Sequence, residues 1–211
     1  MKLIKFSIVM CIKNGEKYLN EQIESILNQD FENWELIIID DCSKDNSFKI
    51  AQKYQKSDSR IFIKKNLTNL GVKYNFLLNS LSSKCEWIVF CDQDDIWSLN
   101  KLSCLYSCIK KNIGYSLFVH NGTYLVSEKD QLFKGAFGEL VRNGQKVYKK
   151  VPNRKLFNLI KTNQLIGCFM CVNKKFLENF ITLIPLADIY HDHWIAIVSS
   201  LYSKTFFINK N

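Results

Sequence analysis

Hydrophobic residues recur along the first half of the chain in two alternating patterns. Continuous apolar runs, typical of buried parallel strands, cover residues 6–12, 34–39, 60–63 and 86–91. Between these runs, apolar residues recur at the three- and four-residue spacing of amphipathic helices, within residues 18–27, 48–54 and 72–81. This alternation predicts right-handed crossovers and a doubly wound α/β fold, in which helices flank a mostly parallel sheet.

The alternation weakens after residue 115. Residues 116–120 and 123–126 are expected to form a hairpin about Asn121-Gly122, and residues 127–150 resemble a mobile flap. The later segments are predicted to be a helix at 157–161, a strand at 166–172, a helix at 195–201 and a strand at 205–208. The second half therefore adds a less regular set of elements to the sheet.

Nothing in the composition divides the chain into separate domains. Of its 211 residues 47% are hydrophobic, and only two prolines and eight glycines interrupt it. No low-complexity tract or Gly/Ser linker separates the apolar segments, so we expect a single domain over residues 1–211. The apolar start is too short for a signal peptide and no stretch reaches bilayer-spanning length, which predicts a cytoplasmic protein.

The formal net charge of +9 suits an anionic partner, such as a phosphorylated substrate, an acidic membrane surface or nucleic acid. The lysines are scattered, however, and tight pairs such as Lys110-Lys111 and Lys149-Lys150 lie on otherwise mixed faces. We therefore expect an ordinary solvated surface, with peripheral association with an anionic membrane as the alternative, and no nucleic-acid partner.

Eight cysteines raise the alternatives of a zinc site or disulfides, because Cys104 and Cys108, and Cys168 and Cys171, form close pairs. Several cysteines instead lie in apolar runs, such as the one that ends at Cys91, where a free thiol behaves as a small hydrophobic group. Disulfides are also rare in the cytoplasm. We therefore expect buried free thiols.

Acidic residues follow two of the predicted strands: Asp40-Asp41 after the second and Asp92-Gln93-Asp94-Asp95 after the fourth. Ligands of such sheets bind beyond the carboxyl ends of the strands, and carboxylates gathered there repel one another unless a cation intervenes. Mn²⁺ or Mg²⁺ suits one or two carboxylates together with substrate phosphates. We expect Asp94 to hold the metal, and Asp92 to hold a ribose or a metal-bound water. The alternative is that Asp94 or Asp95 caps a helix that starts near residue 98.

Two further acidic residues are candidates for the site. Asp41 is expected to accept a hydrogen bond from a nucleobase imide, while Ser43 or Asp45 caps the second helix. Asp192, in His191-Asp192-His193-Trp194, is the candidate base that deprotonates an acceptor hydroxyl. Zinc binding by the two histidines is disfavoured because positions i and i+2 diverge on a helix, and helix capping by Asp192 is a second alternative.

Three motifs occur in a characteristic order: Met-Cys-Ile-Lys-Asn-Gly-Glu at 10–16, Ile-Asp-Asp-Cys-Ser at 39–43 and Phe-Cys-Asp-Gln-Asp-Asp-Ile-Trp at 90–97. With residues 69–76, 163–168 and 191–194 they make the chain resemble, over nearly its whole length, the family 2 glycosyltransferases with a GT-A fold. The Asp-Gln-Asp-Asp-Ile-Trp form is similar to bacterial rhamnosyltransferase-like enzymes of surface-polysaccharide synthesis.

The resemblance implies an inverting transfer of sugar from a UDP- or dTDP-sugar to a hydroxyl of a surface polysaccharide, lipopolysaccharide or lipid-linked acceptor. Residues 1–97 would form the nucleotide-sugar-binding half and residues 98–211 the acceptor-binding half, without the C-terminal extension usual in the family. The implied nucleotide-sugar-binding residues are Cys11, Ile12, Asn14, Glu16, Asp41, Lys73, Asp92 and Gln93. Asp92 and Asp94 would bind the metal, Asp192 would be the general base, and Gly167, His191 and Trp194 would lie on the acceptor side.

One departure from the family concerns the first loop. The usual Pro-Thr-Tyr or Ala-Thr-Tyr after the first strand is replaced by Cys11-Ile12-Lys13, which alters the expected contacts with the base. A nucleotide-binding module without catalysis is therefore one alternative function. A nucleotidyltransferase is another, although the chain lacks a glycine- and lysine-rich phosphate loop, and a dinucleotide oxidoreductase is disfavoured because G-x-G-x-x-G is absent.

Overall fold

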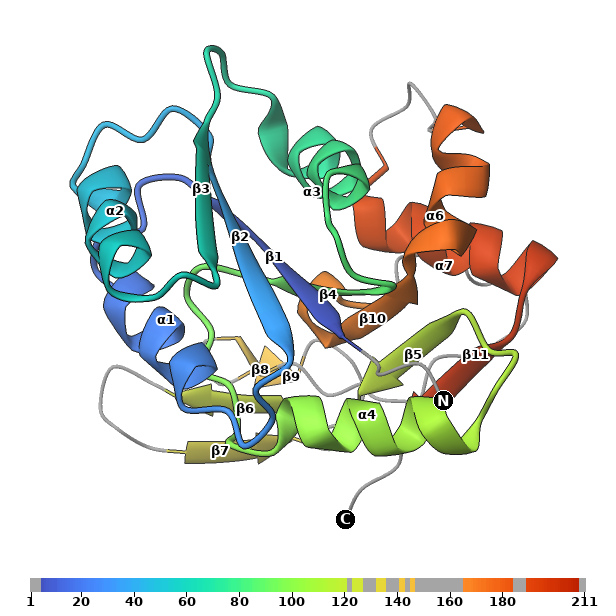
Figure 1. The fold of residues 1–211 in the computed structure, drawn as a ribbon. Helices are drawn as coiled ribbons and strands as arrows, with labels where there is room; N and C mark the ends of the chain where they lie inside the picture. The colour runs from blue at the N-terminus through green and yellow to red at the C-terminus, as the bar shows by residue number, and fades with distance from the viewer. Residues whose placement is uncertain are drawn as a thin grey trace.

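A seven-stranded sheet forms the centre of the molecule (Figure 1). The computed structural model describes residues 5–120, 123–126, 132–135, 141–142, 145–146, 165–183 and 189–208. The strands of this sheet are β1 (Phe6–Ile12), β2 (Trp34–Asp40), β3 (Ile61–Lys65), β4 (Trp87–Cys91), β5 (Leu117–His120), β10 (Met170–Asn173) and β11 (Thr205–Ile208). Their order across the sheet is β11-β5-β10-β4-β1-β2-β3.

The sheet is mostly parallel, as the sequence predicts. β1 pairs in parallel with both β2 and β4, β2 pairs in parallel with β3, and β11 pairs in parallel with β5. Only β10 runs the other way, because it pairs antiparallel with both β4 and β5. The carboxyl ends of β1, β2, β3 and β4 therefore lie at one edge of the sheet, and the predicted α/β fold class is confirmed.

Helices cover both faces of the sheet (Figure 1). The helices α1 (Leu19–Leu27), α2 (Ser47–Ser57) and α4 (Lys101–Lys111) share one hydrophobic core, and α3 (Gly71–Leu81), α6 (Lys174–Phe180) and α7 (His191–Tyr202) share the other. Because side chains alternate along a strand, Ile8 and Met10 of β1 enter the first core and Val9 enters the second. Both faces of β1 are thus buried, which explains its unbroken apolar sequence.

The predicted hairpin about Asn121-Gly122 is wrong. β5 pairs with β10 and β11 inside the main sheet, whereas β6 (Thr123–Val126) pairs with β7 (Leu132–Gly135) in a separate two-stranded sheet. The physical reason is that Leu117, Phe118 and Val119 are all fully buried, so β5 needs cover on both faces.

Two other expectations fall on the second half of the chain. The segment 127–150 contains β7, β8 (Val141–Arg142) and β9 (Gln145–Lys146), and its remaining residues, like the helix predicted at 157–161, lie outside the described residues. The strand predicted at 166–172 is divided into a 3₁₀ turn, η1 (Gly167–Phe169), and β10.

Two further properties concern the helices and the cysteines of the described ranges. None of the helices in the described ranges has both the length and the apolar character that a bilayer crossing requires. All eight cysteines are described, and each is a free thiol.

Candidate active site

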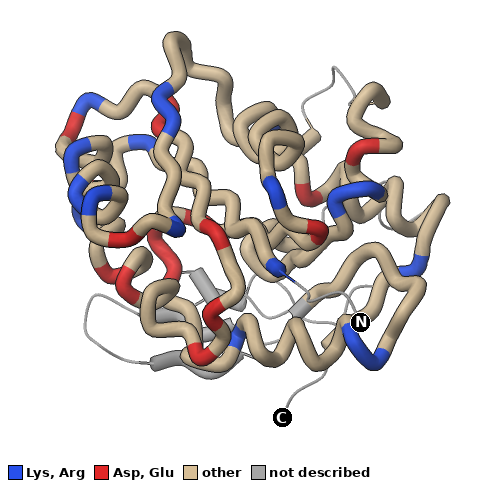
Figure 2. The backbone as a smooth tube through the Cα atoms, viewed as in Figure 1, with Lys and Arg blue, Asp and Glu red and all other residues tan. Residues whose placement is uncertain are grey.

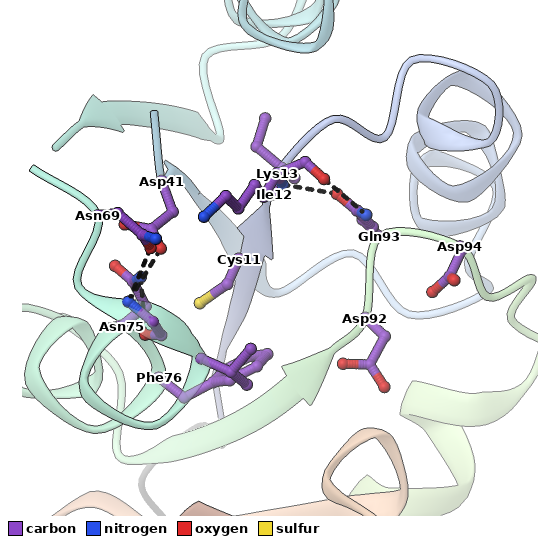
Figure 3. A pocket seen from close by; sticks show the side chains of 12 residues that line it. Cys11, Ile12, Lys13, Asp41, Asn69, Asn75, Phe76, Asp92, Gln93 and Asp94 are labelled. Atoms are coloured by element: carbon purple, nitrogen blue, oxygen red, sulfur yellow. Dashed lines mark hydrogen bonds between the residues drawn. The ribbon is translucent and has the colours of Figure 1, made fainter. Parts of the chain in front are cut away.

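A pocket of about 320 Å³ lies at the carboxyl ends of β1, β2 and β4. Figure 3 shows Asp41 at one side of it and Asp92 and Asp94 at the other, with Cys11 and Phe76 between them. The lining residues are Cys11, Ile12, Lys13, Asp41, Asn69, Gly71, Val72, Asn75, Phe76, Asp92, Gln93 and Asp94. The structure therefore brings acidic residues from the ends of two strands to one pocket.

Asn14 and Glu16, predicted to bind the nucleotide sugar, hold the loop after β1 against the loop after β2. The Asn14 N–H donates to Ser43 Oγ at 3.0 Å, and Asn14 Oδ1 accepts the Lys44 N–H at 2.8 Å. Glu16 Oε2 accepts both the backbone N–H and the side-chain amide of Asn46, at 2.8 and 2.9 Å. Neither Asn14 nor Glu16 lines the pocket, so their side chains support it from outside.

Gln93 connects the loop after β4 to the same structure (Figure 3). Its Oε1 accepts the Lys13 N–H at 2.8 Å, and its Nε2 donates to the Lys13 carbonyl at 3.2 Å. Gly15 leaves room for this contact, since a Cβ at that position would overlap the Gln93 amide. The loops after β1, β2 and β4 are therefore joined into one unit.

Asp41 anchors the start of α3. Its Oδ1 accepts the Leu70 N–H and the Asn66 side-chain amide, both at 2.8 Å, and its Oδ2 accepts the Gly71 N–H at 3.0 Å. Burial favours a higher pKa for Asp41, but hydrogen bonds from Leu70, Asn66, Asn75 and Gly71 outweigh it, so the pKa lies below its ordinary value. Asp41 is therefore an ionised acceptor at the pocket wall.

Neither predicted cap of α2 is its N-cap. That position is Asn46, which makes no side-chain capping bond. Asp45, the residue before the N-cap, accepts the Ser47 N–H at 3.0 Å. Ser43 Oγ instead accepts the Asn14 N–H.

Asp92 lies among other carboxylates. Burial raises its pKa to about 7, and the negative charges of Asp95 and Asp94 add to the effect. Burial also raises the pKa of Asp95, against the opposing charge of Lys101. Oxygen atoms of Asp92 and Asp95 lie within 4.8 Å of each other and of the Cys168 thiol. The structure therefore groups Asp95 with Asp92 more closely than sequence reasoning expected.

The capping alternative for Asp94 and Asp95 is wrong. α4 begins at Lys101, and its N-cap is Asn100, which makes no side-chain capping bond. Asp94 lines the pocket, and Asp95 lies beside Asp92 and Cys168.

Asp192 lies in the first turn of α7 and faces the same region. Its Oδ2 accepts the Gly167 N–H at 3.2 Å and its Oδ1 accepts the His193 N–H at 2.7 Å. Its charge also contributes to the raised pKa of Asp92. The N-cap of α7 is Tyr190, without a side-chain capping bond, so Asp192 is not the N-cap, although a negative charge in the first turn favours the helix.

The three residues expected on the acceptor side are buried beneath Asp192. His191 is 4% exposed, its ring stacks on Phe76 with 4.3 Å between ring centroids, and burial lowers its pKa to about 3. Trp194 is also buried, and its indole N–H donates to the Leu183 carbonyl at 3.2 Å. A Cβ on Gly167 would lie 2.6 Å from His191 Nε2. These residues support the start of α7, and a direct role in acceptor binding stays a prediction.

Of the eight predicted nucleotide-sugar-binding residues, five line the pocket: Cys11, Ile12, Asp41, Asp92 and Gln93. Lys73 does not, like Asn14 and Glu16. The sequence analysis used Lys13 and residues 69–76 only as parts of family motifs, whereas the structure adds Lys13, Asn69, Gly71, Val72, Asn75 and Phe76 to the pocket lining. The available signal was the Asn69-Leu70-Gly71 turn after the third strand, which opens a helix at the same edge of the sheet.

The fold and the pocket define an α/β protein with a nucleotide-binding type of sheet and an acidic site at its carboxyl edge. The family model described as "Glycosyl transferase family 2" matches residues 7–179. The chain therefore belongs to glycosyltransferase family 2, as its motifs predict, and this membership argues against the nucleotidyltransferase alternative.

Two relatives show the range of the similarity. WfgD of Escherichia coli, a UDP-Glc:alpha-D-GlcNAc-diphosphoundecaprenol beta-1,3-glucosyltransferase, is 34% identical over 180 residues, which cover 82% of this chain and 61% of WfgD. TuaG of Bacillus subtilis (strain 168), named for teichuronic acid biosynthesis, is 34% identical over 127 residues, which cover 56% of this chain and 50% of TuaG. The chain thus spans half to about three fifths of the length of these relatives.

Solved structures agree with the fold. Residues 1–349 of TarS from S. aureus superimpose with a TM-score of 0.74 at 19% identity, covering 99% of this chain and 59% of that one. The mannosyltransferase PcManGT from Pyrobaculum calidifontis, solved with GDP-Man and Mn²⁺, gives a TM-score of 0.67 at 11% identity, covering 97% of this chain and 54% of that one. The GT-A fold is confirmed, and the rhamnosyltransferase-like subgroup stays a prediction.

Proposed function

We propose that the chain binds a nucleoside-diphosphate sugar and transfers the sugar, with inversion, to a hydroxyl of a polysaccharide, lipopolysaccharide or lipid-linked acceptor. The observation that carries this proposal is the pocket with Asp41 at one side and Asp92 and Asp94 at the other. A nucleoside diphosphate has a hydrogen-bonding base at one end and a chelating diphosphate at the other, and these two ends match the two sides of the pocket.

Asp41 is proposed to recognise the base. Its carboxylate is ionised, and Oδ2 accepts one backbone N–H while Oδ1 accepts two hydrogen bonds. A carboxylate has about four acceptor sites, so Oδ2 retains capacity for the imide N–H of uracil or thymine. This contact fits UDP and dTDP, which the screen below compares with GDP.

The donor set fits a hard divalent cation, Mn²⁺ or Mg²⁺. Burial and the neighbouring carboxylates raise the pKa of Asp92, so a cation is the natural counter-charge in this part of the pocket. Asp94 and Asp92 would hold it, with Asp95 close enough to Asp92 to assist. When bound, such a cation acts as a Lewis acid on the departing diphosphate.

Asp192 is proposed to accept the proton of the attacking hydroxyl. The hydrogen bonds from the Gly167 and His193 N–H groups fix the orientation of its carboxylate. The packing of His191 against Gly167 and Phe76 fixes the helix that carries it. The protein therefore holds the base in position before an acceptor arrives.

The name of WfgD specifies a diphosphoundecaprenol acceptor, which supports a lipid-linked or polysaccharide acceptor for this chain. We therefore propose that it works in the cytoplasm, peripherally associated with the inner face of the cell membrane. Residues 1–97 would supply the donor site and residues 98–211 the acceptor site.

A thermal-shift screen of the purified protein tests the donor class. UDP, dTDP and GDP are each added with and without Mn²⁺, since a ligand of the native state raises its melting temperature. We expect a shift with UDP or dTDP that is larger in Mn²⁺ and is lost in Asp41→Asn. Absence of any nucleotide-dependent shift contradicts the proposal. Nucleotide binding without consumption of any nucleotide sugar supports the non-catalytic binding module instead.

A further inference from the structure

The loop that follows β3 exposes apolar side chains to solvent. Leu67 is 100% exposed, Leu70 is 39% exposed and Val72 is 50% exposed. An isolated exposed leucine is unremarkable, but apolar residues gathered on one projecting loop are typical of an interaction site. Figure 1 shows this loop projecting beyond the sheet at the top of the view. We refer to residues 64–73 as the β3–α3 tip.

The charge around the β3–α3 tip is of one sign. Residues 59–85 include Arg60, Lys64, Lys65, Lys73 and Lys84 and no Asp or Glu. Lys64 and Lys65 are exposed and precede the apolar residues, with the buried Asn66 between Lys65 and Leu67, and Lys73 directly follows Val72. Figure 2 shows the projecting loop with basic positions at its base.

The acidic residues that contact the β3–α3 tip leave the basic character of its surface unchanged. Asp40 pairs with Lys65 in the sheet and is fully buried. The next residue along the chain is Asp41. It is only 4% exposed, and its carboxylate accepts the N–H groups of Leu70 and Gly71. Its charge is therefore directed into the protein. The exposed part of the tip combines apolar side chains with flanking lysines.

The β3–α3 tip also forms part of the rim of the pocket. β3 pairs in parallel with β2, so its carboxyl end lies at the same edge of the sheet as Asp41. Asn69, Gly71 and Val72 of the tip line the pocket. A partner that binds the tip consequently lies beside the pocket entrance.

We propose that the β3–α3 tip docks the protein on an anionic lipid bilayer. Leu67 inserts among the lipid chains near the headgroups, and Lys64 and Lys65 bind the headgroup phosphates. The chemistry favours a bilayer, because nucleic acid offers no apolar phase for the leucines and a second copy would present the same positive charge. This inference rests on the proposed function for one consequence: docking would place the pocket entrance beside a lipid-linked acceptor.

Vesicle co-sedimentation of the full chain tests the docking. The vesicles are phosphatidylcholine alone or phosphatidylcholine mixed with phosphatidylglycerol, and the variants are Leu67→Ser and the double variant Lys64→Gln/Lys65→Gln. The matched control is Ile113→Ser, since Ile113 is 91% exposed and closely follows Lys110-Lys111. It lies in the connection between α4 and β5, before the amino end of β5 and so at the opposite edge of the sheet. Thermal melting of each variant confirms that it is folded.

The expected results separate the two contributions. The wild type binds mixed vesicles more tightly than phosphatidylcholine, Leu67→Ser weakens binding about tenfold, and Ile113→Ser leaves it unchanged. The lysine variant loses the preference for mixed vesicles, and added salt has the same effect.

Three results would overturn the proposal. They are no preference of the wild type for anionic vesicles, binding by Leu67→Ser as tight as that of the wild type, or loss of binding in Ile113→Ser. Self-association without vesicles that Leu67→Ser abolishes would assign the tip to a second copy instead. UDP binding is measured in parallel, because Leu67 does not line the pocket. Failed docking with intact UDP binding overturns only this inference, whereas absent UDP binding overturns only the proposed function.

Discussion

The side-chain amide of Gln93 pairs with both polar backbone groups of Lys13, accepting its N–H at 2.8 Å and donating to its carbonyl at 3.2 Å. Gln93 lies between Asp92 and Asp94 in the sequence, so this pair fixes the carboxylates relative to the loop after β1. The same loop is bonded to the loop that follows Asp41. The Asp41 side and the Asp92–Asp94 side of the pocket are thereby connected through one amide.

Replacing Gln93 by Leu is expected to weaken both sides of the pocket together. Two hydrogen bonds are lost, at a cost of about 1–3 kcal/mol in the free energy of unfolding. We expect the affinity for UDP, measured by calorimetry in Mn²⁺, to fall about tenfold or more because the carboxylates lose their fixed position. Gln55→Leu, on the exposed surface of α2, is the matched control. Unchanged UDP affinity in Gln93→Leu would show that the pair has no role in the site.

Replacing Asp92 by Asn is expected to stabilise the metal-free protein at pH 8. The pKa of Asp92 is about 7 in the folded protein and 3.8 when unperturbed, so the unfolded state ionises first as pH rises. Stability is therefore lost between about pH 4 and pH 7, and Asn avoids a loss of up to about 4 kcal/mol. Urea unfolding in EDTA measures the difference in free energy of unfolding between Asp92→Asn and the wild type. This difference should become smaller as the pH falls towards 4.

Asp30→Asn, at an exposed position, is the control for this comparison and should show no such difference. A difference between Asp92→Asn and the wild type that does not depend on pH would rule out carboxylate repulsion as its cause. The substitution should also remove the stabilisation that Mn²⁺ gives in the presence of UDP.

The acidic residues after β2 and β4 could be predicted to share an edge of the sheet, because parallel strands end there. The groups that each of these carboxylates contacts could not be predicted in the same way. Asp41 accepts N–H groups from Leu70 and Gly71, about 30 positions later, and no local pattern specifies that contact. The association of Asp95 with Cys168 likewise depends on the placement of η1 beside β4.

The second half of the chain shows where periodicity stops being informative. The sequence of β5 is compatible with either a hairpin strand or an interior strand. The burial of Leu117, Phe118 and Val119 depends on β10 and β11, which lie far away in the sequence. His191 is similar: beside Asp192 it suggests a site residue, but its ring is buried between Phe76 and Phe90. Tertiary packing decides both cases.

The buried His191 ring is expected to make the protein sensitive to acid. Its pKa is about 3 when folded and 6.5 when unperturbed, so the unfolded state binds the proton first as pH falls. Stability should therefore fall below pH 6.5, by up to about 1.4 kcal/mol per pH unit from this group. Because Asp92 acts in the opposite direction, the comparison is between variants: His191→Gln should reduce this slope, and His193→Gln should not. Equal slopes in the wild type and His191→Gln would contradict the prediction.

The proposed role of Asp192 as the base distinguishes an active glycosyltransferase from a nucleotide-binding module. The most direct test compares the wild type with Asp192→Asn, using the nucleotide sugar selected by the thermal-shift screen and a lipid-linked saccharide acceptor. We predict that kcat for sugar transfer falls about 10²–10⁴-fold, because a positioned base contributes that much, while the affinity for UDP in Mn²⁺ is unchanged. Transfer by Asp192→Asn at the wild-type rate would contradict the assignment of Asp192 as the base.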